Sequence, residues 1–209
     1  MGALELDGAA VAVTGAARGI GRATAAEFAA RGARVVLGDL DGAAAREAAA
    51  EVGGDAVGLA LDVRTRTSFG KFLQAAERAA GPLAVLVNNA GIMPVGRFLE
   101  EDEATTRRTL EVNLQGVING MKLALPGMVQ RGDGHVVNVA SMMGKLHIPG
   151  IAVYGASKYA VVGLSAAVRD ELAGTGVTIT CVLPSAVRTE LVSGIPLPRV
   201  LPTVEPEQV

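Results

Sequence analysis

The sequence has few aromatic residues, one cysteine, two histidines and no tryptophan. The single Cys181 excludes a disulfide within the chain, and His135 and His147 lack the spacing of metal ligands, so we expect no metal site. No apolar run is long enough to cross a bilayer, and the first residues lack the pattern of a signal peptide. These absences favour a protein of the reducing cytoplasm.

Clustered positive charge is also absent. The 19 basic and 21 acidic residues are mixed along the chain and leave a net charge of −2. Proteins that bind nucleic acids or anionic membranes concentrate lysine and arginine on one surface. We therefore expect neither a nucleic acid nor a membrane as a partner.

The chain is instead rich in aliphatic residues. Half of its residues are hydrophobic, although aromatic residues make up only 3%. Short runs of valine and isoleucine are typical of strands that are buried on both faces of a parallel sheet. The length of 209 residues suits one domain.

Strand-like and helix-like segments alternate along the chain. We predict strands at 9–14, 34–37, 57–61, 83–87, 136–140 and 177–183, and helices at 20–31, 43–52, 66–80, 103–130 and 154–173. This alternation predicts an α/β fold, a single doubly wound Rossmann-type parallel sheet with helices on both faces. We assign 1–191 to an NAD(P)-binding domain that includes the catalytic site. The proline-rich segment 192–209 is predicted to be a mobile substrate loop without packed elements.

A glycine-rich turn joins the first predicted strand to the first helix. It has the form Gly-x-x-x-Gly-x-Gly, from Gly15 through Gly19 to Gly21, with Arg18 and Ile20 between the glycines. Glycines let a phosphate approach the backbone, and the helix N-terminus offers N–H groups to it. The spacing differs from the usual dinucleotide fingerprint, and many ordinary turns also use glycine.

Asp39 follows the second predicted strand, where a carboxylate accepts hydrogen bonds from the hydroxyls of an adenosine ribose. The same carboxylate repels a 2′-phosphate, so we predict NAD as the cofactor. Arg18 supports the less favoured alternative, NADP, because a guanidinium pairs well with a phosphate. Asp39 is also compatible with a simple turn before the next helix.

Tyr154 and Lys158 are one helical turn apart and are therefore neighbours on a helix surface. A nearby ammonium lowers the pKa of a phenol, which is about 10 in an unperturbed tyrosine. A tyrosine with a lowered pKa can transfer protons near neutral pH. The spacing alone equally fits a half-buried tyrosine and a solvated lysine.

Taken together, these motifs resemble the short-chain dehydrogenase/reductase family over about residues 6–191. The resemblance rests on the glycine turn and Asp39, and on Asp62-Val63, Asn88-Asn89-Ala90-Gly91, Asn113, Ser141, Tyr154 and Lys158, which occur in family order. It implies an NAD(P)-dependent enzyme that acts on the CH–OH group of an alcohol.

The resemblance also implies four catalytic residues. Tyr154 exchanges a proton with the substrate oxygen, and Ser141 hydrogen-bonds the same oxygen, so that both bind substrate. Lys158 lowers the pKa of Tyr154 and holds the nicotinamide ribose. Asn113 holds a water that relays protons. The implied cofactor contacts, besides Tyr154 and Lys158, are Gly15, Arg18, Gly19, Ile20, Gly21, Asp39, Asp62, Val63, Asn89, Ala90, Gly91, Pro184, Val187 and Thr189.

The chain departs from the family in two places. Pro184-Ser185 stands where the family commonly has Pro-Gly. Family members continue into a further helix and a seventh strand, which we do not find before Val209, so we expect a truncated chain and a sheet without that strand.

The substrate and the assembly are predicted less directly. The loop 142–153 is apolar, which favours a small hydrophobic alcohol or ketone as substrate. The resemblance implies a homodimer or homotetramer that pairs through the helices 103–130 and 154–173. The alternatives to an NAD-dependent dehydrogenase are an NADP(H)-dependent carbonyl reductase and a dinucleotide-binding protein without catalysis.

Overall fold

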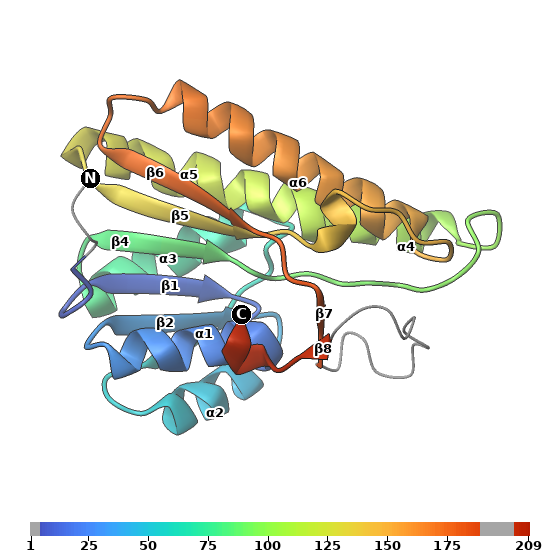
Figure 1. The fold of residues 1–209 in the computed structure, drawn as a ribbon. Helices are drawn as coiled ribbons and strands as arrows, with labels where there is room; N and C mark the ends of the chain where they lie inside the picture. Colours follow the sequence, from blue (N-terminus) through green and yellow to red (C-terminus); the bar gives the residue numbers. More distant parts are fainter. Residues whose placement is uncertain (1–4, 189–202) are drawn as a thin grey trace.

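The computed structural model describes residues 5–188 and 203–209. Its main sheet has six parallel strands in the order β3-β2-β1-β4-β5-β6 (Figure 1). In chain order the strands are β1 (Ala10–Thr14), β2 (Arg34–Asp39), β3 (Val57–Ala60), β4 (Leu83–Asn88), β5 (Gly134–Val139) and β6 (Val177–Val182). This order confirms the predicted doubly wound Rossmann-type sheet.

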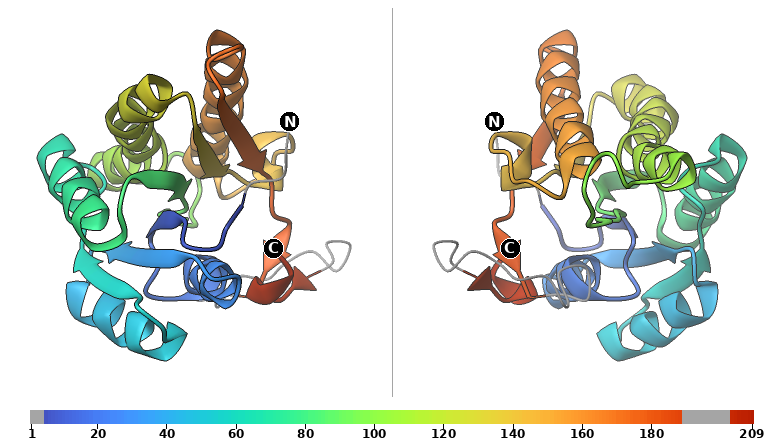
Figure 2. Two further views of the ribbon diagram at one scale, coloured as in Figure 1. Left: turned by 90° about the vertical axis from the view of Figure 1, so that its left-hand side faces the viewer. Right: turned by 90° about the vertical axis from the view of Figure 1, so that its right-hand side faces the viewer.

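Helices cover both faces of this sheet (Figure 2). One face packs against α1 (Gly19–Ala30) and α2 (Gly42–Val52). The other packs against α3 (Arg66–Ala80), α5 (Gly116–Arg131) and α6 (Ala152–Glu171), with α4 (Glu103–Leu110) leading into α5. Because the strands are buried on both faces, they read in the sequence as nearly continuous aliphatic runs.

Two hydrophobic cores hold the layers together, one on each face of the sheet. On the α1–α2 face, strand valines such as Val11 and Val35 meet small helix residues such as Ala25. On the other face, Phe69 and Phe72 of α3 pack edge to face with ring centroids 6.2 Å apart. Because the strands between these cores are all parallel, their carboxyl ends lie together on one side of the sheet.

The helices differ in how they begin. The N-caps of α2, α3 and α4 are Asp41, Thr65 and Asp102, and each side chain accepts at least one hydrogen bond from the first-turn backbone. The N-cap of α1 is Arg18, whose side chain makes no capping bond. Like α6, whose N-cap Ile151 makes no side-chain capping bond, α1 lacks the capping acceptor that α2, α3 and α4 have.

The helix predicted at 103–130 is not continuous. A π-helical turn, η1 (Glu111–Gln115), separates α4 from α5. The amide of Asn113 in this turn bonds the backbone of Ile92 in the loop after β4, a tertiary contact that no helical periodicity reveals. Single π turns of this kind are frequent at functional sites.

The prediction of no packed element after Leu191 is also wrong in part. Strand β7 (Ala186–Val187) pairs in parallel with β8 (Thr203–Val204), and the short helix η4 (Pro206–Gln208) packs against α1. Both strands are too short to show a periodic pattern. Residues 192–202 lie outside the described residues. Within the described part of the chain, the main sheet has no seventh strand.

None of the helices in the described ranges is long and apolar enough to cross a membrane. The division of the chain at residue 191 stays a prediction.

Candidate active site

A cavity of about 950 Å³ lies at the carboxyl ends of the strands. Open α/β sheets bind their ligands at this edge. Loops that follow all six strands of the main sheet contribute to its wall. Fifteen of the predicted site residues line it: Gly15, Arg18, Gly19, Ile20, Asp39, Asp62, Val63, Asn89, Ala90, Gly91, Ser141, Tyr154, Lys158, Pro184 and Val187.

Two predicted residues, Gly21 and Asn113, stand apart from this wall. Gly21 is buried, and a Cβ there would meet the carbonyl oxygen of Gly15, so this glycine permits close packing within the turn. Asn113 is fully buried behind the cavity wall. Thr189 lies outside the described residues.

The glycine turn is fastened to the end of β4. Asn89 donates side-chain hydrogen bonds to the carbonyl oxygens of Thr14 and Gly15, at 2.9 and 3.0 Å. Gly15 has φ +63°, and a Cβ there would lie 2.7 Å from the Cα of Ala90. Only glycine combines this backbone conformation with such a close approach at little cost. These contacts fix the conformation of the turn beside the N-terminus of α1.

Asp39 ends β2 and points toward the same turn. Its carboxylate accepts a hydrogen bond from the Ala17 backbone N–H at 3.1 Å and one from the Asp41 N–H at 3.2 Å. These bonds orient the carboxylate at the cavity wall that it shares with Arg18. Both residues that bear on the choice between NAD and NADP therefore line one end of the cavity.

Ser141, Tyr154 and Lys158 form the other end. Tyr154 and Lys158 lie in the first two turns of α6, and both are nearly buried. Ser141 follows β5, and its Oγ accepts a hydrogen bond from the Met143 N–H at 3.1 Å. The hydroxyl proton of Ser141 is then free to hydrogen-bond Tyr154, and the two side chains are in contact. The predicted substrate-binding pair is thus assembled.

The electrostatics of this end differ from the prediction. Burial raises the pKa of Tyr154, and the hydrogen bond from Ser141 opposes that rise. Lys158 Nζ donates to the carbonyl oxygen of Val139 at 2.9 Å and lies 5.8 Å from the centroid of the Tyr154 ring. Burial also lowers the pKa of Lys158 to about 8. We expected Lys158 to lower the pKa of Tyr154, but desolvation of the phenolate outweighs every favourable contact.

Asn113 connects the π turn to α6, the helix that carries Tyr154 and Lys158. Its Oδ1 accepts from the Ile92 N–H, and its Nδ2 donates to the Ile92 carbonyl and to Ser157 Oγ, at 2.9, 2.9 and 3.1 Å. Ser157 in turn donates to the Tyr154 carbonyl oxygen at 2.6 Å. A Cβ on Gly91 would lie 3.4 Å from Asn113 Oδ1 and 3.6 Å from Lys158 Nζ. Gly91 therefore leaves a space between these two polar groups.

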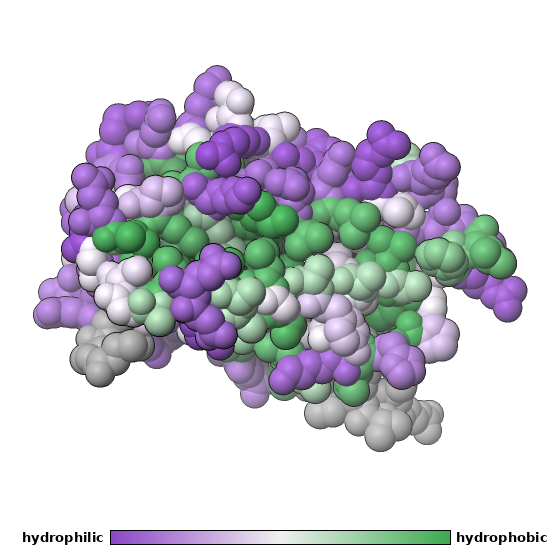
Figure 3. Space-filling view, turned by 90° about the horizontal axis from the view of Figure 1, so that it is seen from above, coloured by the Kyte–Doolittle hydropathy of each residue, from purple (hydrophilic) through white to green (hydrophobic). Residues whose placement is uncertain are grey.

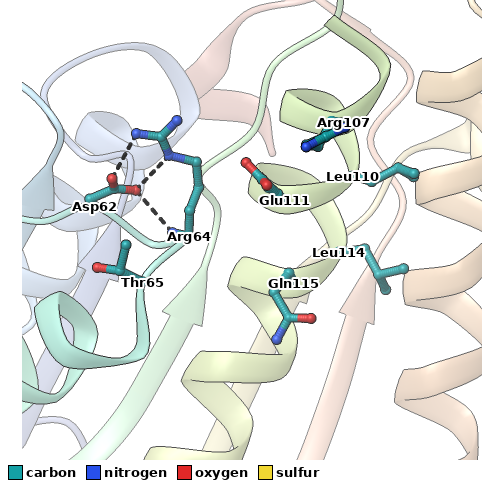
Figure 4. Close-up of a pocket in the computed structure, with 8 residues that line it drawn as sticks. All are labelled: Asp62, Arg64, Thr65, Arg107, Leu110, Glu111, Leu114 and Gln115. Carbon is teal, nitrogen blue, oxygen red and sulfur yellow. Dashed lines mark hydrogen bonds and ion pairs between the residues drawn. The ribbon is translucent and has the colours of Figure 1, made fainter. Parts of the chain in front are cut away.

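A second pocket, of about 540 Å³, adjoins the cavity (Figure 4). Asp62 and Arg64 line both spaces, whereas Arg107 and Glu111 line only the smaller one. Arg64 was not predicted from the sequence, because nothing in the chain distinguishes it from other surface arginines.

Sequence reasoning also missed half of the apolar wall. The loop with Met142, Met143, Ile148 and Ile151 was predicted, but the segment 92–95 was not. The two are joined where the Gly96 N–H donates to the Gly150 carbonyl at 2.9 Å. The position of 92–95 directly after Asn89-Ala90-Gly91, at the carboxyl end of β4, is the signal that would have found it.

Known proteins share this combination of fold and motifs. The sequence model for the short chain dehydrogenase family matches residues 9–198. The chain belongs to the short-chain dehydrogenase family.

Two similar proteins have the names of dehydrogenases. The 2,5-dichloro-2,5-cyclohexadiene-1,4-diol dehydrogenase LinX of Sphingobium indicum is 37% identical over 195 residues, which cover 92% of this chain and 78% of the relative. Estradiol 17-beta-dehydrogenase 11 of Macaca fascicularis is 35% identical over 208 residues, covering 97% of this chain and 69% of the relative. This short-chain dehydrogenase is therefore an oxidoreductase of the class that acts on CH–OH groups.

A solved structure has the same fold. The crystal structure of a short chain dehydrogenase/reductase from Burkholderia phymatum in complex with NAD matches this short-chain dehydrogenase with a TM-score of 0.88 and 32% identity. The match covers 90% of this chain and 69% of that chain.

Lys158→Met should change how the free energy of unfolding depends on pH. Burial lowers the lysine pKa from 10.5 to about 8, so between these values the unfolded chain binds more protons than the folded protein. The wild type therefore gains stability as the pH rises through this window. We expect the free energy of unfolding of the wild type to rise relative to that of Lys158→Met, by up to about 1.4 kcal/mol per pH unit.

Urea denaturation at about pH 7.5 and about pH 9.5 measures this effect. Lys122→Met on the exposed face of α5 is the control, and its difference from the wild type should stay constant. A constant difference for Lys158→Met as well would contradict the lowered pKa.

Proposed function

We propose that this protein is an NAD-dependent dehydrogenase that transfers a hydride between NAD(H) and a hydrophobic secondary alcohol or ketone. The observation that carries the proposal is one continuous cavity, which joins the glycine turn and Asp39 at one end to Ser141, Tyr154 and Lys158 at the other. The close backbone approach at Gly15 and the α1 N-terminus without a side-chain cap fit a pyrophosphate between these ends.

In this proposal, Tyr154 and Ser141 act at the substrate oxygen, and Lys158 acts at the cofactor. The nicotinamide, when bound, supplies the hydride chemistry. Tyr154 exchanges the proton at the substrate oxygen, and Ser141, oriented by the Met143 N–H, donates a hydrogen bond to the same oxygen. Lys158, whose Nζ donates to the Val139 carbonyl, binds the nicotinamide ribose.

Asn113 and Gly91 support a path for the proton. The space beside Gly91 lies between Asn113 Oδ1 and Lys158 Nζ, and each of these groups can hydrogen-bond a water there. Ile92 and Ser157 fix the Asn113 side chain, which keeps Oδ1 beside that space. The proposed path runs from Tyr154 past Lys158 to this water.

The walls of the cavity favour an apolar substrate. Methionine, proline, valine and isoleucine side chains from 92–95 and 142–151 surround the Ser141–Tyr154 end. The names of two relatives refer to a chlorinated cyclohexadiene diol and to estradiol, which supports an alcohol on an apolar ring. The cytoplasmic location stays a prediction from the sequence.

Tyr154→Phe should keep NAD binding but lower kcat by at least about 100-fold, because the phenylalanine cannot exchange a proton. Tyr159→Phe is the matched control, since Tyr159 is the other tyrosine of the chain, lies on the same helix and is 46% exposed. Formation of NADH from a secondary alcohol measures turnover. Unchanged turnover in Tyr154→Phe would contradict the role of this residue.

The NAD preference has its own test. We expect NADH to bind at least about tenfold more tightly than NADPH, because the Asp39 carboxylate repels a 2′-phosphate. Asp39→Asn should reduce the difference between the affinities for NADH and NADPH. Asp55→Asn removes the same charge at an exposed position and should leave this difference unchanged. The fluorescence change of the reduced dinucleotides on binding measures both affinities. Equal or tighter binding of NADPH by the wild type would favour the NADP-dependent alternative, to which Arg18 points.

We also propose that the protein is a dimer or tetramer through α4–α5 and α6. Seen from above, the side of the molecule where α6 lies carries a broad apolar band with polar margins (Figure 3). Leu110 and Tyr159 are exposed on these helices, and apolar helix faces of this kind tend to be covered. Light scattering at micromolar concentration should give two or four times the chain mass of 21.2 kDa. A monomeric mass would contradict the assembly.

A further inference from the structure

The segment Asp62-Val63-Arg64, which follows β3, has an anchored backbone. The Asp62 N–H donates to Ser68 Oγ at 3.0 Å. Asn119 of α5 donates side-chain hydrogen bonds to the carbonyl oxygens of Val63 and Arg64, at 2.9 and 3.2 Å. The backbone here is thus held by two helices, without help from the Arg64 side chain.

The Arg64 side chain instead holds the Asp62 carboxylate (Figure 4). Asp62 Oδ1 accepts from the Arg64 backbone N–H at 3.0 Å and from Nε at 2.9 Å, and Oδ2 accepts from Nη2 at 2.7 Å. This two-point contact fixes the plane of the carboxylate. The hydrogen bond from Arg64 also holds the pKa of Asp62 below its usual value. Asp62 is therefore an ionised acceptor in a defined orientation.

The contact leaves part of the carboxylate available. An ionised carboxylate has about four acceptor positions, of which Arg64 occupies two on Oδ1 and one on Oδ2. The remaining position is on Oδ2 of a residue that lines the large cavity. An unoccupied acceptor position on a carboxylate oxygen favours a ligand that offers an N–H or O–H group.

We propose that Arg64 is a positioning residue that sets the affinity and base selectivity at the adenine end of the dinucleotide. By holding Asp62, it presents the remaining Oδ2 position to the exocyclic amino group of adenine. A base with a hydrogen atom in place of that amino group offers the carboxylate no donor and binds more weakly. The inference rests on the proposed function, since it presumes a dinucleotide in the cavity.

A purely structural role for Arg64 has little support. The pair is part-exposed, with side-chain exposures of 36% for Arg64 and 25% for Asp62, and such pairs contribute little to stability. The backbone is already anchored by Ser68 and Asn119. Arg64→Gln should therefore fold with nearly unchanged stability in a urea titration.

The test compares NAD with nicotinamide purine dinucleotide, in which a hydrogen atom replaces the adenine amino group. Calorimetric titration should show that the wild type prefers NAD by about tenfold, the worth of one hydrogen bond to a charged group. Arg64→Gln should lose most of that preference, because NAD binding weakens and binding of the analogue barely changes. Arg64→Lys keeps the charge without the two-point contact and should recover only part of it.

Arg107→Gln is the matched control, because Arg107 lines the smaller pocket but not the cavity. It should keep the wild-type preference. An equal loss of affinity for both dinucleotides in Arg64→Gln, or an unchanged preference, would overturn the role of Arg64 while leaving the proposed function intact. A wild type that binds neither dinucleotide would overturn the proposed function and this inference together.

Discussion

The hydrogen bonds between Asn89 and the glycine turn are the constraint on which the site depends. Thr14 Oγ1 accepts from the N–H groups of Asn89 and Ala90, while the Asn89 side chain donates to the turn. The same loop continues to Ile92, which Asn113 links to Ser157 and so to the catalytic helix. One connected set of bonds therefore positions the glycine-turn end of the cavity relative to the end with Ser141, Tyr154 and Lys158.

Burial gives the catalytic end its character. Tyr154 and Lys158 are both shifted toward their neutral forms, because each loses the solvation of its charge. A phenol with a raised pKa holds its proton firmly at neutral pH. In the proposed mechanism, the hydrogen bond from Ser141 opposes this rise where the proton is exchanged. The proposed mechanism therefore depends on the balance between desolvation of Tyr154 and the hydrogen bond from Ser141.

The features that sequence predicted well are those set by local spacing. The strand runs follow from buried aliphatic residues, and Tyr154 and Lys158 share a helix face because they are four residues apart. The features it missed depend on contacts between distant segments. The π turn at Asn113, the β7–β8 pair and the hold of Arg64 on Asp62 have no periodic signature. The predicted lowering of the Tyr154 pKa was wrong, because the spacing between Tyr154 and Lys158 carries no information about burial.

The central claim is that the protein oxidises an apolar secondary alcohol with NAD in this cavity. The most direct measurement is the appearance of NADH absorbance with a panel of such alcohols, compared between the wild type and Ser141→Ala. We predict NADH formation with at least one alcohol and a loss of at least about 100-fold in Ser141→Ala, with NAD binding retained. Binding of NAD without NADH formation from any alcohol of the panel would contradict the claim and favour a dinucleotide-binding protein without catalysis.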